Sequence, residues 1–170
     1  EHNMLNSLAA IAIAKELRLS NEAIASALSS FQGVGRRCQW MGETRIGSKR
    51  VAVIDDYGHH PSEIRVTIKA VRTGWPSRRL VVAFQPHRYS RTQHLLSEFS
   101  SCFEAADLLW VTEVFAASET PIADVNGQRL AVAIAEAGQP AAYAATLDVL
   151  RKKVRMTMHP GDVVVFLGAG

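Results

Sequence analysis

The sequence predicts an α/β fold with a doubly wound, mainly parallel sheet, preceded by a small helical appendage. Two observations lead to this prediction. Short apolar runs rich in β-branched residues recur along the chain, as is typical of buried strands. Stretches with apolar residues at helical spacing separate these runs, and such alternation favours right-handed crossovers and a parallel sheet. The strands expected in this sheet are residues 51–54, 80–84, 108–111, 140–144 and 162–167.

The composition is that of an ordinary globular protein. The chain has 170 residues, of which 48% are hydrophobic and 21% charged. No apolar run approaches the ~18 residues of a membrane span, and no signal peptide is recognisable. The net charge of +3 fits either a solvated surface or affinity for phosphate-bearing ligands, and no basic run with interleaved aromatics indicates nucleic-acid binding. Cys38 and Cys102 lack metal-binding spacing and fit a reducing cytoplasm.

The chain begins with two predicted helices, residues 3–18 and 20–30, the second starting at Ser20. Glycines at 33 and 35 then break the pattern, which places a domain boundary at about residues 31–35. A helical pair of this size is too small to form a core, so we expect it to be the end of a neighbouring domain. The side chains expected to face inward are Leu5, Leu8, Ile13, Ile24 and Leu28.

The remaining elements follow in the order that a sheet of this type requires. Residues 36–43 alternate and predict a strand that forms a hairpin with the strand at 51–54, through a turn at Gly47 and Ser48. Helices are then expected between successive parallel strands, with their apolar stripes against the sheet. The predicted helices are residues 62–73, 93–106, 127–137 and 146–156.

The stretch around which the chain is organised is VAVIDDYGHHPSE, residues 51–63. A buried strand leads into a loop of ionisable and hydrogen-bonding residues, and a helical pattern begins at Ser62 and Glu63. In open α/β sheets, ligands bind outside the carboxyl ends of the strands. So many polar groups at such an end are costly to bury, which indicates a functional site.

Polar side chains follow three of the predicted strands. If these loops are neighbours, their side chains converge on one crevice. Arg88 and Arg91 can hold a carboxylate or a phosphate through bidentate hydrogen bonds, and carboxylates beside them can hold a ribose or a magnesium-linked phosphate. The residues alone therefore predict a phosphate- or carboxylate-binding crevice. The candidates are Asp55, Asp56, Tyr57, His59 and His60 after the first strand, His87, Arg88 and Arg91 after the second, and Glu113 and Glu119 after the third.

Each candidate also has a structural alternative. Asp56 can cap a turn, the two histidines can lie on the surface, and the arginines after the second strand can pair with surface acids. Arg36 and Arg37 can form a basic strand edge, and Asn3 and Asn6 can cap a helix. No third ligand lies near the His-His-Pro run, so we predict no metal site here. No serine has a partnering arrangement that indicates a hydrolase.

Five motifs resemble those of the ATP-dependent muramyl-peptide ligases. They are HNMLN, FQGVGRR, DDYGHHPSE, FQPHRYSRT and FAASETPI, and they extend from residue 2 to residue 122. This family has three domains, the central one an ATPase with a P-loop and the last one a dinucleotide-binding-like fold. The resemblance implies that residues 1–33 are the C-terminal helices of the central ATPase domain. It implies that residues 34–170 are the C-terminal ligase domain, cut short at its end.

The resemblance implies a reaction in which L-alanine is added to UDP-N-acetylmuramate while ATP is hydrolysed, through an acyl phosphate. A sister ligase that recycles a whole muramyl tripeptide shares much of the pattern, and a non-catalytic module for nucleotides or anions is a third reading. The sequence has no P-loop motif, so we expect Mg²⁺ to be held mainly by the rest of the parent chain. We expect this chain alone to be inactive and its parent to be a bacterial cytoplasmic enzyme.

The resemblance also implies a role for each matching residue. Nucleotide binding is implied for His2, Asn3, Asn6, Arg37 and Asp56. Substrate binding is implied for Tyr57, His59, His87, Arg88 and Arg91, with the last two holding the carboxylate of the incoming amino acid. Catalytic roles are implied for His60, Arg88 and Arg91, and no residue is assigned to a metal.

Overall fold

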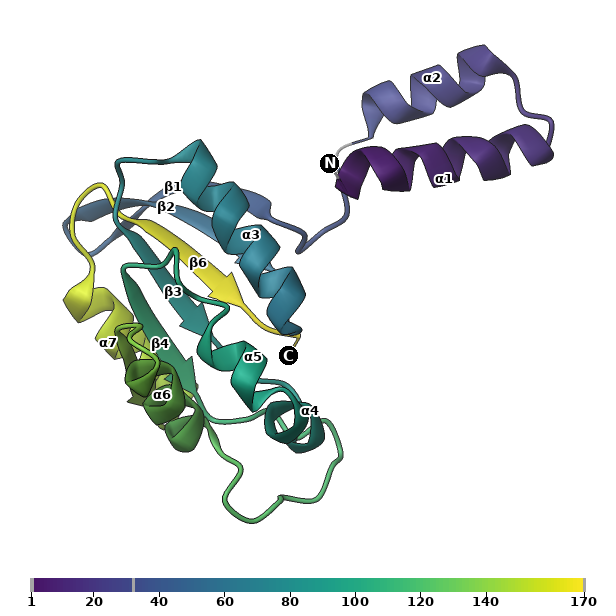
Figure 1. The fold of residues 1–170 in the computed structure, drawn as a ribbon. Coiled ribbons are helices and arrows are strands. Elements are labelled where there is room, and N and C mark those ends of the chain that lie inside the picture. Colours follow the sequence, from purple (N-terminus) through teal and green to yellow (C-terminus); the bar gives the residue numbers. More distant parts are fainter. Residues whose placement is uncertain (1, 32, 170) are drawn as a thin grey trace. The chain divides into compact units, whose positions relative to one another are not determined.

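The computed structural model describes residues 2–31 and 33–169, without the side chains of His2 and Asn3 (Figure 1). The chain divides into two compact units, Glu1–Val34 and Gly35–Gly170. Each unit is described by itself. None of the described helices is long and apolar enough to cross a membrane.

The first unit consists of two helices, α1 (His2–Glu16) and α2 (Asn21–Ser30). Ser20 caps α2 as its position predicts, since its hydroxyl accepts a hydrogen bond of 3.2 Å from the Ala23 N–H. The prediction that the apolar side chains face inward is wrong: Leu5, Leu8 and Ile13 are each about 60% exposed, and α2 buries none of its residues. Two short helices without a third layer cannot enclose a core.

The second unit is built on a sheet with the order β1-β2-β6-β3-β4-β5. β1 is antiparallel to β2, and all other neighbours are parallel, which confirms the predicted hairpin followed by a parallel sheet. The last strand in the sequence lies between the first two parallel strands, as Figure 1 shows. The strands are β1 (Gln39–Ile46), β2 (Lys49–Asp56), β3 (Leu80–Phe84), β4 (Leu108–Thr112), β5 (Ala141–Ala144) and β6 (Val163–Leu167).

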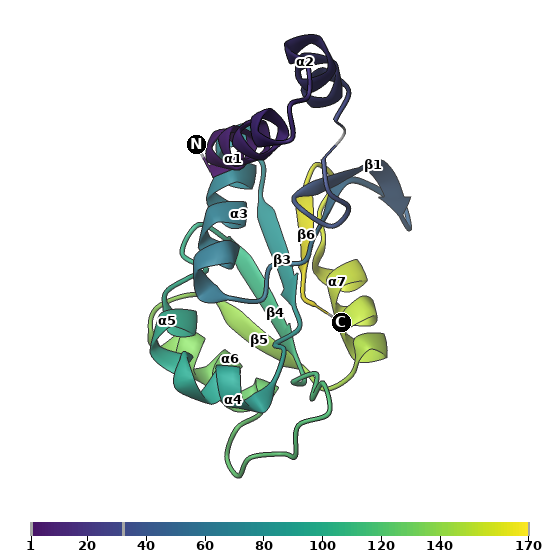
Figure 2. The same cartoon turned by 90° about the vertical axis from the view of Figure 1, so that its right-hand side faces the viewer.

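Helices cover both faces of this sheet, as Figure 2 shows. One core lies beneath α3, α5 and α6, where Ile64, Phe99 and Leu130 are fully buried. A second core on the opposite face contains Leu150 and Val154 of α7. Alternate residues of each strand serve the two cores, so both faces need apolar side chains. The helices are α3 (Pro61–Gly74), α4 (Tyr89–His94), α5 (Leu96–Ser100), α6 (Gly127–Glu136) and α7 (Leu147–Thr157).

Most predicted elements differ from the structure by one or two residues at an end, and two differ for reasons that the backbone shows. The strand predicted at 36–43 begins only at Gln39, because Arg36 and Cys38 adopt positive φ angles of 56° and 48° that do not fit an extended strand. The helix predicted at 93–106 is two short helices that meet at Leu95, whose φ and ψ of −109° and 24° are not helical. Phe99 is buried as its spacing predicts.

Candidate functional site

Aromatic side chains from three loops meet at the carboxyl edge of the sheet. The rings of Tyr57 and His59, after β2, are 5.2 Å apart, and His59 lies 5.6 Å from His87, after β3. His87 in turn stacks at 5.6 Å on Phe115, after β4, and these four rings are called the ring row below. The predicted convergence of the polar loops is therefore confirmed.

The loops after β2 and β3 meet although β6 separates their strands. Gly168 follows β6 directly, and the Gln85 N–H donates a hydrogen bond of 3.0 Å to the carbonyl of Leu167, the last residue of the strand. The φ of Gly168 is 153°, and a Cβ atom there would lie only 3.2 Å from the Gln85 carbonyl oxygen. A glycine after β6 thus lets the neighbouring loops close over this strand.

Asp56 has backbone partners rather than an open carboxylate. It is 4% exposed, and its two oxygens accept hydrogen bonds of 2.6 Å from the Cys38 N–H and 2.7 Å from the Gly58 N–H. It therefore fixes the turn after β2 and the segment before β1, which is the turn-capping alternative of the sequence analysis. A direct contact of Asp56 with a nucleotide stays a prediction.

Arg36 ties the segment before β1 to the ends of two strands. Its Nε donates a hydrogen bond of 3.0 Å to Asp55, and an Nη donates one of 2.7 Å to the Gly168 carbonyl. Arg37 is half exposed and pairs with Glu63 at 3.2 Å. Both guanidinium groups lie over the Tyr57 ring, 5.5 and 5.6 Å from its centroid, a distance at which cations are attracted to the ring face.

His60 and Glu63 form the start of α3. Nδ1 of His60 accepts a hydrogen bond from the Ser62 N–H, which caps the helix, and its ring is exposed. Glu63 accepts hydrogen bonds from the backbone N–H groups of His59 and His60, at 3.2 and 3.3 Å. Partial burial raises the pKa of Glu63, but these bonds and the one from Arg37 outweigh burial and leave that pKa below its usual value. This role of Glu63 was not predicted, although a glutamate three residues after a helix cap is its signal.

His87 and Arg91 form a pair beside the ring row. Arg91 Nη1 donates to the His87 carbonyl at 3.1 Å and lies 3.2 Å from Nδ1 of His87. A guanidinium has no acceptor, so Nδ1 must accept and the ring proton belongs on Nε2. Partial burial, together with the positive charges around it, lowers the pKa of His87 below 6.5. The ring is therefore mainly neutral at pH 7.

Arg88 is a cation of the site, and together with hydrogen bonds from Ser90 its positive charge helps to lower the pKa of Glu119. Its side chain is exposed and makes no hydrogen bond or ion pair with any residue that the structure describes. Its backbone has φ 74° and ψ 135°, a region that side-chain-bearing residues rarely adopt. The backbone is fixed by a hydrogen bond of 2.8 Å from the Arg88 N–H to the Phe115 carbonyl. Strained backbone of this kind is typical of functional sites.

The two glutamates after β4 have different partners. Glu113 accepts hydrogen bonds from the Tyr143 hydroxyl at 2.6 Å and the Gly127 N–H at 3.0 Å, so it joins β5 to the start of α6. Burial and this carboxylate together raise the pKa of Tyr143 to about 12. Glu119 instead binds Ser90 at the start of α4. Neither carboxylate is arranged with others to hold a cation: no group of three His, Cys, Asp or Glu suited to a metal occurs among the described residues.

Of the predicted residues in the first unit, Asn6 is exposed on α1, whereas the side chains of His2 and Asn3 lie outside the described part of the chain. A surface hollow of about 580 Å³ lies beside α6 and is lined by residues that include Thr92, Asn126 and Arg129. None of the predicted site residues lines it. The ring row and Arg88 are therefore the candidate site.

Comparison with known proteins agrees with this geometry. Residues 36–170 match the family described as "Mur ligase, glutamate ligase domain". The chain belongs to the Mur ligase family. Over 170 residues, 99% of this chain, it is 48% identical to the UDP-N-acetylmuramate–L-alanine ligase of Geobacter sulfurreducens and 49% identical to that of Desulfotalea psychrophila.

Solved structures show the same fold. The UDP-N-acetylmuramate–alanine ligase of Thermotoga maritima matches 99% of this chain with a TM-score of 0.76 and 30% identity. A murein peptide ligase of Psychrobacter arcticus has the same fold, with a TM-score of 0.75 and 23% identity. This Mur ligase chain spans 36% of the two curated relatives named above and 34% of the Thermotoga structure, so it corresponds to about a third of such enzymes.

Proposed function

We propose that this chain is the C-terminal part of the ATP-dependent ligase that adds L-alanine to UDP-N-acetylmuramate in peptidoglycan precursor synthesis. The observation that carries the proposal is Arg88, an exposed guanidinium that makes no side-chain hydrogen bond with a described residue and lies, like Arg91, near a neutral His87. Such a group matches the carboxylate of an incoming amino acid. The identity of 48% to alanine-adding ligases over 99% of the chain supports L-alanine as that amino acid.

In the proposed reaction, the carboxylate of UDP-N-acetylmuramate attacks the γ-phosphate of ATP, the bond between the β- and γ-phosphates breaks, and ADP leaves an acyl phosphate behind. The amine of alanine then attacks the acyl carbon, and inorganic phosphate leaves. Arg88 and Arg91 bind the alanine carboxylate and stabilise the negative charge that develops in the tetrahedral intermediate. Nδ1 of His60 is engaged by Ser62, so the exposed Nε2–H is the group of His60 available to the reacting centre. Tyr57 and His59 line this centre.

The nucleotide is assigned to the Tyr57 end of the ring row, away from Arg88 and Arg91. Arg37 lies over Tyr57 and is half exposed, so it can reach the ribose or a phosphate of ATP, while Asp56 holds the turn in place. His2, Asn3 and Asn6 are assigned to the adenine end of ATP. Residues 1–33 are assigned to the end of the ATPase domain and residues 34–170 to the ligase domain. Mg²⁺ and the P-loop are assigned to the rest of the parent chain, and the enzyme is assigned to the bacterial cytoplasm because its proposed substrates include nucleotides.

Phosphate release by the complete gene product tests this proposal. We expect turnover of ~1 s⁻¹ or more only when ATP, UDP-N-acetylmuramate and L-alanine are all present. The 170-residue chain alone should give no turnover. Turnover with the intact tripeptide instead of alanine would assign the chain to the recycling ligases, and nucleotide binding without any turnover would make it a binding module.

A further inference from the structure

The loop after β4 is fastened to the start of α4 by Glu119. The Ser90 hydroxyl donates a hydrogen bond of 2.6 Å to Oε1 of Glu119, and the Ser90 N–H donates one of 3.0 Å to Oε2. The two residues are 29 positions apart in the sequence. The hydrogen bonds from the Ser90 hydroxyl and N–H lower the pKa of Glu119, so its carboxylate is ionised at neutral pH. Glu119 is therefore a charged anchor between two loops.

This anchor replaces a cap that the local sequence does not supply. α4 is preceded by Arg88, whose side chain makes no capping hydrogen bond. The first N–H groups of a helix need acceptors from outside it. The Glu119 carboxylate supplies one for Ser90 from a different loop. The start of α4, and with it the backbone next to Arg88, thus depends on a residue distant in the sequence.

Two further bonds join the same loops on the other side of Arg88. The Arg88 N–H donates a hydrogen bond of 2.8 Å to the Phe115 carbonyl, and the Phe115 N–H donates one of 2.8 Å to the Pro86 carbonyl. The strained φ of 74° at Arg88 lies between these bonds and the Glu119 anchor. A strained conformation persists only where its surroundings enforce it. Releasing either side allows Arg88 to relax and its guanidinium to leave its position.

We propose that Glu119 is a positioning residue for amino-acid binding: it holds the loop of Arg88 and Arg91 in the orientation that receives the carboxylate of the incoming amino acid. This inference rests on the proposed function. Glu119 acts through Ser90 rather than on the substrate, because each of its oxygens already accepts a hydrogen bond from Ser90.

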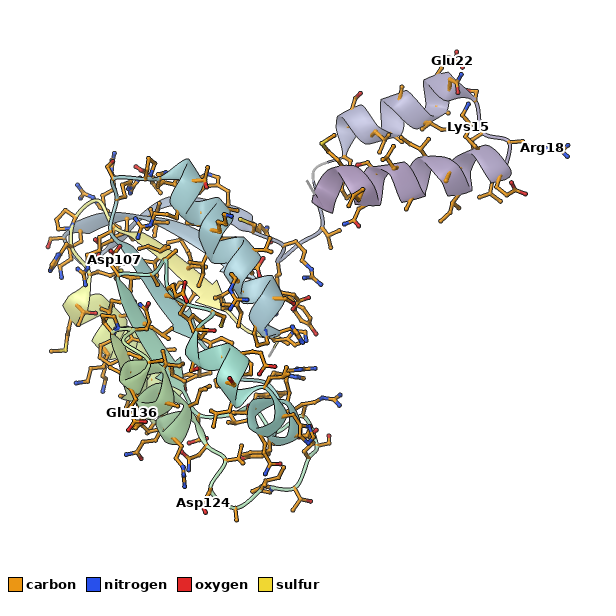
Figure 3. All side chains as sticks on the ribbon, viewed as in Figure 1. Lys15, Arg18, Glu22, Asp107, Asp124 and Glu136 are labelled. Atoms are coloured by element: carbon orange, nitrogen blue, oxygen red, sulfur yellow. The ribbon has the colours of Figure 1, made fainter. Side chains whose placement is uncertain are left out.

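The first test is the kinetics of Glu119→Gln in the complete gene product. We expect the KM for L-alanine to rise about 10- to 100-fold, the range for losing a charge-assisted hydrogen bond, with the KM for ATP unchanged. Ser90→Ala should also raise the KM for L-alanine. It should add little to the effect of Glu119→Gln in the double variant, because both changes remove the same interaction. The matched control is Glu136→Gln on α6, an exposed glutamate that makes no hydrogen bond or ion pair with described residues (Figure 3).

A second measurement is independent of the reaction. Amide hydrogen exchange of Ser90 and Arg88 should be faster in Glu119→Gln than in the unchanged protein and in Glu136→Gln. Unchanged exchange with an unchanged KM for alanine would overturn the role of Glu119. A raised KM with unchanged exchange would also overturn it, because Glu119 would then act directly on the substrate or on the charge of Arg88. If exchange is faster in Glu119→Gln but the unchanged gene product shows no turnover with L-alanine, the proposed function is overturned and the structural role of Glu119 is still supported.

Discussion

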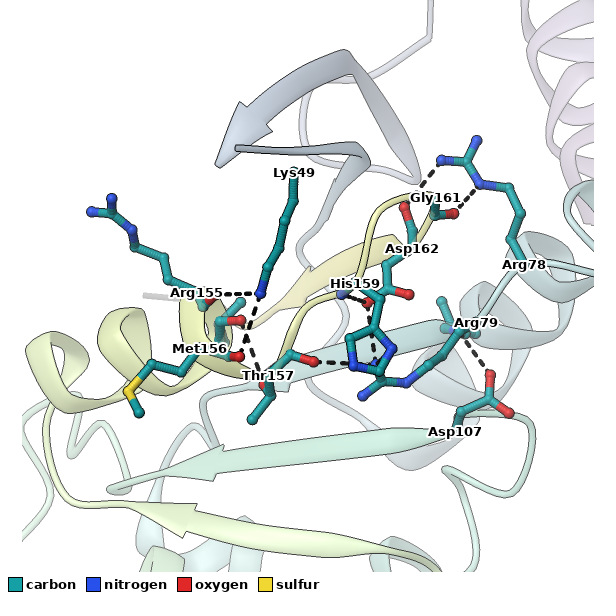
Figure 4. Close-up of polar contacts among 12 residues, drawn as sticks. Lys49, Arg78, Arg79, Asp107, Arg155, Met156, Thr157, His159, Gly161 and Asp162 are labelled. Carbon is teal, nitrogen blue, oxygen red and sulfur yellow. Dashed lines mark hydrogen bonds and ion pairs between the residues drawn. The ribbon is translucent and has the colours of Figure 1, made fainter. Parts of the chain in front are cut away.

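Arginines gather at both edges of the parallel sheet, but their guanidinium groups have different partners at the two edges. At the amino edge, Arg78 donates to the carbonyls of Gly161 and Asp162, and Arg79 donates to the Thr157 carbonyl at 3.1 Å (Figure 4). Lys49 likewise donates to two carbonyls at the end of α7. These cations hold the loops and helix ends of the fold together through hydrogen bonds to groups of the protein itself.

At the carboxyl edge the arrangement is reversed. Arg88 is exposed and makes no side-chain hydrogen bond with a described residue, while the Asp56 and Glu119 carboxylates accept hydrogen bonds from backbone or hydroxyl groups of the site loops. Positive φ angles at Arg36, Cys38 and Arg88 also lie at this edge. Figure 3 shows how far apart the edges are, with Asp107 at one end of the second unit and Asp124 at the other. One edge is thus used for stability, and the other keeps a cation available at the cost of backbone strain.

The sharpest test of this contrast is Arg88→Ala. In the complete enzyme we expect kcat/KM for alanine to fall about 100- to 1,000-fold, as when one donor to a developing charge is lost. Arg78→Ala at the other edge should leave kcat/KM for alanine unchanged and lower only the stability. Steady-state kinetics of both variants measure this, and a larger fall of kcat/KM for alanine in Arg78→Ala than in Arg88→Ala would contradict the contrast between the two edges.

Substitutions at the amino edge of the sheet should lower the stability of the protein. Asp162 is 2% exposed and accepts hydrogen bonds from the His159 N–H at 2.7 Å and from Arg79 at 3.5 Å. Asp162→Ala leaves these donors unsatisfied, so we expect the free energy of unfolding to fall by about 3 kcal/mol in urea denaturation. Asp148→Ala, which removes an exposed ion pair with Arg151, should cost less than about 1 kcal/mol. Equal losses would contradict the assignment.

Replacing the strained residue itself should raise stability. Arg88→Gly removes the steric cost of φ 74°, and the greater flexibility of glycine in the unfolded chain offsets part of the gain. We expect a net increase of about 1 kcal/mol in the free energy of unfolding, together with loss of alanine use. Arg88→Ala keeps the Cβ and should show no such gain. A destabilised Arg88→Gly protein would mean that the backbone conformation is not strained.

The smallest expected effect is the titration of His87. Its pKa in the folded state lies below 6.5 because of partial burial and the surrounding positive charges. The unfolded chain therefore binds more protons below about pH 6.5, so His87 makes the free energy of unfolding fall as the pH falls towards its folded-state pKa. NMR titration should give a value below 6.5 that rises in Arg91→Ala. A value above 6.5 would rule out the neutral ring.

The sequence predicted much of the fold because its signals are local. Ser20, Asn126 and Thr146 cap helices where the sequence suggests that helices begin, and the buried strands coincide with β-branched runs. The convergence of the polar loops was also predictable, since parallel strands share one carboxyl edge. The helix at 93–106 was less predictable, because its start depends on Arg88 and its break on Leu95 rather than on apolar spacing.

The sequence by itself thus determined the strands, the helix caps and the edge at which the chemistry-bearing residues gather. Only the tertiary structure decided which of these residues have partners. Asp56 binds Cys38, Glu113 binds Tyr143 and Glu119 binds Ser90. Each pair joins segments that are distant in the sequence, so spacing alone cannot distinguish a carboxylate that serves the fold from one that faces a ligand. The order of the strands in the sheet brings these segments together, and Arg88 is left exposed with no side-chain hydrogen bond to a described residue.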